Sequence, residues 1–470
     1  MTNKYDQHDY RALFTGLDIE VPLLDGSKRK YINFDNAAST PSLRFVKDKV
    51  DHYLDYYSSV HRGTGFKSQI STHLYEEARH IVLDFVGANA SEHACIFGKN
   101  TTEAINTLAH RFPFTPQRDV VLVGSQEHHS NDLPWRVVAH VEHIGLNPDG
   151  SLDEGDYIQK LEKYRDRLAL VSVTGASNVT GFINPIHRMA EQAHAVGAQI
   201  CVDCAQLAPH RAISMGKLDD PAHLDYITIS AHKMYAPFGT GALIGRRDTF
   251  AQGEPFMRGG GEVEIVTRDS VTWSEPPDRD EAGSPNVVGA IALAAAIQQL
   301  KSVGMDKVAA HEASLTRYLL SRLSKMDGIK VYGSDSPAKA EERLGVVPIN
   351  LDGMSHYLVA AILGYEFGIG VRNGCFCAHP YLLELMGVDE TEAQEVRAQI
   401  QSHDKRAIPG LVRISFGLYN NEREIDELCQ SLEMILSGKY KGVYHQEIPS
   451  GSFIPDGWKV DFDRYFTLEI

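Results

Sequence analysis

Residues 227–241, ITISAHKMYAPFGTG, carry the pattern that decides the fold and locates its chemistry. An apolar, β-branched run ends at Ser230, Lys233 follows three residues later, and a loop containing Gly and Pro comes next. The run predicts a buried strand. A lysine just beyond such a strand can be desolvated, which lowers its pKa and makes the amine nucleophilic. For a lone lysine a solvated loop position is the commoner case, so the surrounding segments determine the interpretation.

Similar short apolar runs recur on both sides of this segment. Strands are predicted at residues 94–98, 120–124, 168–174, 199–203, 225–230 and 241–245. Helical patterns separate them at residues 102–110, 133–140, 153–165 and 185–196. This alternation predicts a doubly wound, mostly parallel α/β sheet. Ligands bind such sheets at the carboxyl ends of the strands.

The pattern changes after a long helical stretch at residues 287–303. Further helices are predicted at residues 307–326, 356–365 and 422–436, and strands at residues 329–332, 346–351, 369–373 and 412–418. These elements indicate a second, smaller α+β domain. The expected organisation is an N-terminal segment (1–30), a large domain (31–296), a small C-terminal domain (297–439) and a C-terminal extension (440–470).

Composition excludes several classes of protein. The 470 residues are 43% hydrophobic and 23% charged, which is typical of globular chains and unlike collagen or disordered proteins. The net charge of −16 argues against a nucleic-acid or anionic-membrane partner. The apolar runs are too short to span a bilayer, and the N-terminus lacks the apolar core of a signal peptide. We therefore expect a cytoplasmic protein.

The chain has six cysteines, too few for a disulfide framework. Two close pairs occur, Cys201 with Cys204 and Cys375 with Cys377. A four-thiolate zinc site is disfavoured, because Cys201 and Cys204 lie in a strand-like segment without a zinc-knuckle turn. No metal is expected.

Polar residues follow the predicted strands. Asp203 ends an apolar strand, where a carboxylate can keep a pyridinium nitrogen protonated, and Gln206 can bond to a ring hydroxyl. The alternative is an ordinary aspartate in a turn. Between residues 98 and 103, Asn100 can cap a helix whose N–H groups and threonine hydroxyls suit a phosphate. A plain helix cap explains that segment equally well.

Two further segments carry candidate groups. In residues 127–131 an imidazole can stack on a flat ring and relay protons, although a lone histidine is more often structural. The loop 372–380 carries two thiols, of which either can be a nucleophile, although buried inert thiols are commoner. Arg372 and Arg413 each offer a fork of N–H groups for a substrate carboxylate.

Together these motifs resemble the class V aminotransferase family of pyridoxal-phosphate (PLP) enzymes, of fold type I. Within it the chain is most similar to the group II cysteine desulfurases and selenocysteine lyases. The matching motifs, in family order, are FDNAAS (34–39), VHRG (60–63), NTTEAIN (100–106), EHHSN (127–131), LPW (133–135), SNVTG (177–181), VDCAQ (202–206), SAHK (230–233), EAGSPN (281–286) and VRNGCFCA (371–378). The resemblance implies a seven-stranded, mostly parallel sheet flanked by helices, plus a smaller α+β domain.

The resemblance also implies roles for individual residues. Lys233 is expected to bind PLP covalently and to move the Cα proton, and Cys377 is expected to accept sulfur. Other implied cofactor contacts are Asp203 to the pyridine nitrogen, Gln206 to the phenolic oxygen, His128 to the ring face, and Thr101, Thr102, Ser230 and His232 to the phosphate, with Ser284 reaching the phosphate of a second subunit. Implied substrate contacts are Asn178, Arg413, Arg372, Asn36 and His61.

The expected function is therefore PLP-dependent desulfuration of L-cysteine to L-alanine, with a persulfide on Cys377, a sulfur-acceptor protein and a homodimer. Cys375 stays open as the nucleophile, and the sequence does not separate cysteine from selenocysteine. Another class V reaction (a C–S lyase, epimerase or aminotransferase) is the alternative, because one scaffold hosts all of them. If the chain were a non-enzymatic scaffold or regulator, Lys233 or Asp203 would be expected to be replaced, and both are present. The family usually has glycine where Asn100, Cys204 and Ala231 stand.

Overall fold

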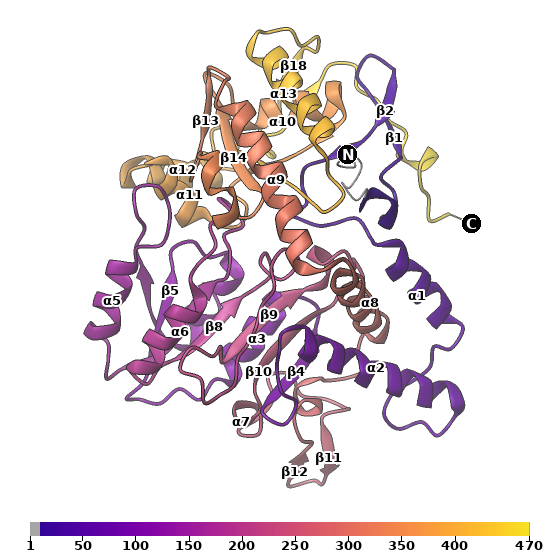
Figure 1. Cartoon of the computed structure of the whole chain (residues 1–470), viewed down its shortest axis with the longest axis vertical. Helices are drawn as coiled ribbons and strands as arrows, with labels where there is room; N and C mark the ends of the chain where they lie inside the picture. Colours follow the sequence, from indigo (N-terminus) through magenta and orange to yellow (C-terminus); the bar gives the residue numbers. More distant parts are fainter. Residues whose placement is uncertain (1–9, 470) are drawn as a thin grey trace, which may run out of the picture.

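The computed structural model describes residues 10–469 and centres on a seven-stranded sheet (Figure 1). Its strands are β4 (His93–Gly98), β5 (Val120–Gly124), β6 (His140–Ile144), β7 (Leu168–Thr174), β8 (Gln199–Asp203), β9 (Tyr226–Ser230) and β10 (Gly241–Arg246), in the spatial order β4-β10-β9-β8-β7-β5-β6. Strand β10 pairs antiparallel with both of its neighbours, and the other pairs in the sheet are parallel. The expected mostly parallel sheet is confirmed.

Helices cover both faces of this sheet. One face packs on α2 (Phe66–Phe85), α5 (Glu154–Lys163), α6 (Ile186–Ala195) and α8 (Val287–Val303), and the other on α3 (Thr101–Arg111), α4 (Trp135–Val138) and α7 (Arg247–Phe250). Side chains of β8 alternate between the two: Ile200 and Val202 belong to the first core and Cys201 to the second. Because both faces are buried, the strands have nearly continuous apolar sequences.

Two parts of the large domain differ from expectation. Helices α1 (Arg44–Leu54) and α2, which pack against α8, were not predicted (Figure 1). The helix expected at residues 133–140 is wrong, because only Trp135–Val138 is helical and β6 begins at His140. Strand β6 lies at the sheet edge and is partly exposed, so its sequence, HVEHI, lacks the apolar run that identified the other strands.

The smaller unit is built on a four-stranded antiparallel sheet. Its strands are β13 (Ile329–Val331), β14 (Val346–Leu351), β17 (Leu411–Ser415) and β16 (Arg372–Gly374), in that order, and its helices are α9 (Met305–Leu323), α10 (His356–Phe367), α11 (His379–Met386), α12 (Glu390–Gln401) and α13 (Glu422–Leu436). This architecture confirms the expected α+β type. The strand expected at residues 369–373 is divided into β15 (Ile369–Gly370) and β16.

The boundary between the two units remains a prediction. The expected division after residue 296 lies inside α8, and α9 begins after a bend of 78°. The short strand β3 (Ile32–Asn33) pairs with β15, so Ile32 and Phe34 pack in the core of the smaller unit although they were assigned to the large domain.

Short hairpins decorate the periphery. They are β1 (Glu20–Pro22) with β2 (Lys28–Lys30), β11 (Val263–Val266) with β12 (Val271–Trp273), and β18 (Tyr444–Gln446) with β19 (Phe453–Pro455). The β11–β12 hairpin projects from the end of the large domain far from the smaller unit (Figure 1). In the C-terminal extension, the Tyr444 hydroxyl donates to Glu366 Oε1 at 2.9 Å, which fastens the extension to α10.

The remaining helical turns are short 3-10 segments at Tyr10–Leu13, His129–Asn131, Ala231–Lys233, Asp278–Asp280, Pro337–Glu342 and Phe462–Arg464. Residues 1–9 of the expected N-terminal segment, with most of the stretch tested for a signal peptide, lie outside the described residues. Among residues 10–469, no single helix has the length and apolar character needed to cross a membrane. The bent pair α8 and α9 meets those criteria only when its two helices are taken together.

Candidate active site

A cavity of about 230 Å³ opens at the carboxyl ends of the sheet strands, where the sequence placed the chemistry. Residues from both units line it. The lining residues with predicted roles are Thr101, Thr102, His128, Asn178, Asp203, Gln206, Ser230, His232, Lys233, Arg372, Cys377 and Arg413. Loops that are far apart in the chain therefore meet around one space large enough for a small organic molecule.

Lys233 follows β9 in the 3-10 segment Ala231–Lys233 and is partly buried. Burial lowers the pKa of its amine to about 8, and the nearby charge of Asp203 opposes that shift. A substantial fraction of the amine is therefore neutral near pH 8, which is the nucleophilic and proton-accepting form.

Asp203 ends β8 and is only 5% exposed. Its Oδ1 accepts a hydrogen bond from the Ala205 N–H at 2.9 Å, and burial raises the pKa of the carboxyl. Gln206, three residues after Asp203, donates from Nε2 to the Ala37 carbonyl at 2.8 Å. A buried carboxyl of this kind suits a cationic ring nitrogen, which would supply the charge that its surroundings lack.

The N-terminus of α3 provides an anion site on another wall. Asn100 Oδ1 accepts from the Glu103 N–H at 3.1 Å, and the Thr101 N–H donates to Ser230 Oγ at 2.9 Å. Thr101 Oγ1 is buried and has no hydrogen-bond partner among the described residues. A phosphate oxygen at the helix N-terminus would accept this hydroxyl, so the site fits the phosphate end of PLP.

His128 lies between Lys233 and the anion site. Its Nδ1 accepts from the Ser130 N–H at 3.1 Å, which leaves the proton of the neutral ring on Nε2. Burial, reinforced by the positive charge of Lys233, lowers the pKa of His128 to about 3. Burial and Lys233 likewise lower the pKa of His232 to about 4. Both imidazoles are therefore neutral at physiological pH, and a neutral ring can stack on a flat cofactor.

Arg413, on β17, provides positive charge from the smaller unit and is 3% exposed. One of its terminal nitrogens donates to the Asn178 carbonyl at 2.9 Å and the other to Asp35 Oδ1 at 3.2 Å. Burial lowers its pKa to about 10, so the guanidinium stays charged at neutral pH. Arg372 is exposed at the cavity rim, 3.7 Å from Asp35 Oδ2. The pair can receive an anionic group such as a carboxylate.

The two thiols of the loop differ in their surroundings. Cys375 is buried, its Sγ donates to the Pro409 carbonyl at 3.2 Å, and burial raises its pKa to about 11. Cys377 is exposed and lines the cavity. Among the cysteines that the sequence left open, only Cys377 combines access to solvent with access to the site.

Three residues with predicted roles lie outside this cavity. Asn36 is buried behind the cavity wall, and its Oδ1 has no hydrogen-bond partner among residues 10–469. His61 is exposed and meets the ring of Tyr75 edge-on at 5.7 Å. Ser284 lines a neighbouring cavity of about 210 Å³. Ser284 is expected to contact the phosphate bound by a second subunit. The structure contains one chain, so this contact stays a prediction.

Three other lining residues with polar or aromatic side chains had no predicted role. Ser130 Oγ lies 2.6 Å from Thr102 Oγ1 and 2.9 Å from His128 Nδ1, so it connects the anion site to the imidazole. Thr174 ends β7, and its position at a strand end was the available signal. Phe376 lies under the Arg413 guanidinium, 4.7 Å from ring centroid to Cζ, and no pattern in the sequence pointed to this contact.

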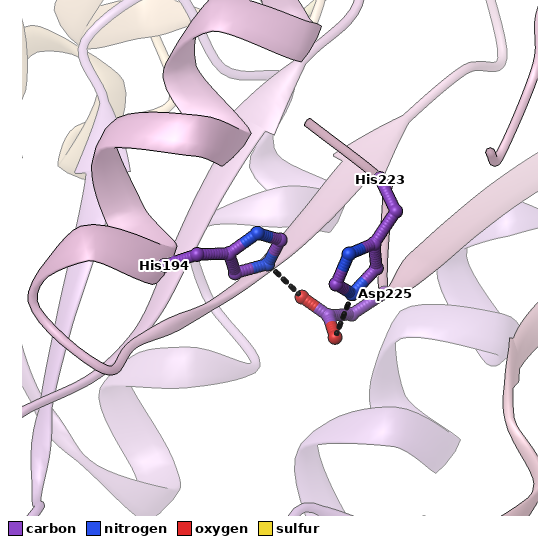
Figure 2. A group of neighbouring side chains, drawn as sticks. All are labelled: His194, His223 and Asp225. Atoms are coloured by element: carbon purple, nitrogen blue, oxygen red, sulfur yellow. Dashed lines mark hydrogen bonds and ion pairs between the residues drawn. The ribbon is translucent and has the colours of Figure 1, made fainter. Parts of the chain in front are cut away.

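A separate polar cluster lies at the opposite ends of the strands (Figure 2). Asp225, just before β9, contacts His194 Nε2 at 2.9 Å through one carboxylate oxygen and His223 Nε2 at 3.2 Å through the other. The ring planes are only 21° apart with centroids 4.2 Å apart, so the Nε2 lone pairs cannot converge on one cation. The cluster is therefore a hydrogen-bonded network around a buried carboxylate.

Comparison with known proteins adds a family and a fold. The profile of the family described as aminotransferase class-V matches residues 32–428. A probable cysteine desulfurase from Halobacterium salinarum is 35% identical over 436 residues, which cover 91% of this chain and 96% of the relative. The apo structure of a cysteine desulfurase from Thermococcus onnurineus has a TM-score of 0.75 at 33% identity, covering 87% of this chain and 95% of the other. A cysteine desulfurase structure from Escherichia coli has a TM-score of 0.74 at 27% identity, covering 93% and 99%.

Proposed function

This chain belongs to the class V aminotransferase family, and from that premise we propose that it is a PLP-dependent cysteine desulfurase. It converts L-cysteine to L-alanine and retains the sulfur as a persulfide on Cys377. The observation that carries the proposal is that Lys233, Asp203 and Cys377 line one cavity with Arg413. An epimerase or transaminase has no use for an exposed thiol beside such a lysine.

The residues that would hold PLP are those around the cavity. Lys233 would bind it covalently, Asp203 and Gln206 would contact ring heteroatoms, His128 would stack on the ring, and Thr101, Thr102, Ser230 and His232 would hold the phosphate. When bound, PLP supplies an electron sink for the charge that remains at Cα after proton removal.

The protein groups then divide the work. The Arg413 guanidinium, with Arg372 and Asn178, orients the substrate carboxylate. The neutral amine of Lys233 takes the Cα proton, because its pKa of about 8 lies near the working pH. Cys377 forms a bond to the substrate sulfur as the C–S bond breaks. The carbon fragment keeps the electron pair of the C–S bond and is protonated to alanine, while Cys377 becomes a persulfide, so sulfur and electrons balance.

Partners and compartment belong to the same proposal. A homodimer is proposed because Ser284 is expected to serve a second subunit. An acceptor protein is proposed because the sulfur on exposed Cys377 can be reached from outside. A cytoplasmic setting is supported by the free state of all six cysteines, since thiols persist in reducing compartments.

The test is a paired assay on purified, PLP-loaded protein. With L-cysteine, the wild type should form alanine and, with a thiol reductant, sulfide in equal amounts. Cys377→Ala should form neither, while Cys375→Ala, the matched control two residues away, should keep its activity. L-selenocysteine in parallel reactions measures the preference between the two substrates. Absence of alanine from PLP-loaded wild type would overturn the proposal in favour of another class V reaction.

A further inference from the structure

We propose that His129 is a positioning residue for Cys377, which it holds from the loop after β5 through two hydrogen bonds to the backbone that directly follows the thiol. This inference rests on the proposed function only in taking Cys377 as the nucleophile. His129 and the loop that it contacts are about 250 residues apart in the chain.

The backbone around Cys377 needs external support. Phe376 and Cys377 have φ angles of 52° and 56°, so two consecutive residues with side chains adopt the left-handed conformation that glycine favours. Phe376 is held by the Asn178 side chain, whose Nδ2 donates to its carbonyl at 2.8 Å. Cys377 is held by His129, whose backbone N–H donates to the Cys377 carbonyl at 2.8 Å.

The His129 side chain provides the second contact. Helix α11 begins at His379, and its N-cap residue, Ala378, supplies no side-chain cap. The first N–H groups of a helix lack acceptors within the helix. His129 Nε2 accepts the His379 N–H at 3.2 Å and so takes the place of a cap. The two bonds of His129 thus fix the backbone at residues 377 and 379, which carries the Cys377 side chain.

The second contact requires a neutral ring at His129. Burial, followed by repulsion from His379, lowers the His129 pKa, and Arg136 acts in the same direction while Asp132 opposes it. The His379 ring stacks on His129 at 5.0 Å and 6°, and the His128 ring lies 6.3 Å away. Burial also lowers the pKa of His379, so that ring favours its neutral form. Protonation of His129 would remove the lone pair that accepts the His379 N–H, and the start of α11 would lose this contact.

The experiment compares His129→Leu, which removes the acceptor, with His129→Gln, whose Oε1 can replace Nε2. In PLP-loaded enzyme, His129→Leu should lower kcat about 10-fold at unchanged KM for cysteine, because a misplaced nucleophile affects the chemical step and not substrate binding. His129→Gln should restore kcat. In the pH profile of kcat, it should also remove the fall at acidic pH that protonation of His129 causes, because glutamine does not titrate. The exposed His187→Gln, outside the site, is the control for a histidine substitution.

Two readouts are independent of turnover. Hydrogen exchange of residues 377–386 should quicken in His129→Leu and match wild type in His129→Gln. Iodoacetamide should still alkylate Cys377 in both variants, which shows that the thiol is present and only misplaced. Wild-type kcat and wild-type exchange in His129→Leu would overturn the inference, as would failure of His129→Gln to restore either. If wild type forms no alanine, the proposed function fails, and hydrogen exchange alone still tests the two contacts.

Discussion

The two ends of the seven-stranded sheet use the same residue types in opposite ways. At the carboxyl ends, burial lowers the pKa of Lys233 and His128 and raises that of Asp203, so each group is pushed toward its neutral form. At the amino ends, burial also tends to raise the pKa of Asp225. Hydrogen bonds from His194 and His223 outweigh this effect, and the pKa of that carboxyl is lowered. The bond to Asp225 in turn raises the pKa of His223.

The difference shows what separates reactive groups from structural ones. Burial is comparable, since Asp203 is 5% and Asp225 1% exposed. What differs is whether the fold provides a committed partner for the charge. Asp225 has two imidazoles, the Ile200 N–H and the Arg246 guanidinium around it, whereas Asp203 accepts one backbone hydrogen bond and faces a cavity. A buried charge without a built-in partner is available to bind a ligand.

The largest loss of activity is expected from Lys233→Ala, which removes the amine proposed to accept the Cα proton. Alanine formation should fall by at least about 10³-fold, because the proton acceptor and the covalent anchor are lost together. The measurement is the rate of alanine formation at saturating cysteine, with circular dichroism to show an intact fold. The exposed Lys217→Ala should match wild type. Appreciable turnover by Lys233→Ala would assign the proton transfer to another group.

A smaller loss of activity is expected from Asp203→Asn. Alanine formation should fall about 10²-fold, because a carboxylate placed for a cationic ring nitrogen is replaced by a neutral amide. The Asp203 charge also raises the Lys233 pKa, so its removal should lower that pKa below its value of about 8. NMR titration of ¹³C-methylated lysines in cofactor-free protein measures this. Asp225→Asn, at the other end of the sheet, should leave the Lys233 titration in place.

Asp225→Asn is expected to have the smallest effect on catalysis. It is expected to lower the stability of the fold. Loss of the shared carboxylate should lower the free energy of unfolding by about 3 kcal/mol, because His223 and Arg246 lose their buried counter-charge. Alanine formation at 25 °C should stay near wild type. Urea unfolding at several pH values measures the stability.

The pH dependence of that loss follows from the two shifts. The lowered pKa of Asp225 stabilises the fold above the ordinary value of 3.8, and this contribution is lost as pH falls through the folded pKa. The raised pKa of His223 stabilises the fold below 6.5, and this contribution is lost as pH rises through the folded pKa. The gap between wild type and Asp225→Asn should therefore be widest between about pH 4 and pH 6.5. A gap that does not change with pH would contradict the two pKa shifts of Asp225 and His223.

Much of the fold could be predicted from the sequence because its central strands are buried on both faces. Strands β5, β7 and β8 have the predicted bounds, since an uninterrupted apolar run ends where burial ends. The half-exposed β6 lacked that signal and was assigned to a helix. Helices α1 and α2 received no assignment, although the apolar positions of α1 recur at helical spacing as clearly as those of α5 and α6.

The site could be predicted as a set of strand-end residues but not as a geometry. The placement of Asp203 and Lys233 at the carboxyl ends of apolar strands is readable from sequence, whereas the adjacency of those two strands comes from the structure. The left-handed backbone at Cys377 is not readable, because neither Phe376 nor Cys377 favours it. Nor is the stacking of His129 on His379, since it depends on how the two units meet. The two loop thiols became distinguishable only when the structure buried one of them.

Because the other five thiols are buried, their reactivity toward a thiol reagent reports unfolding of the chain. A disulfide-exchange dye added to native protein should titrate one equivalent per chain, at Cys377, and six after denaturation. Cys429 packs in the core of the smaller unit, whereas Cys95, Cys201 and Cys204 are buried in the cores on the two faces of the large sheet. The stoichiometry of labelling during slow unfolding thus records which unit loosens first, without any engineered probe.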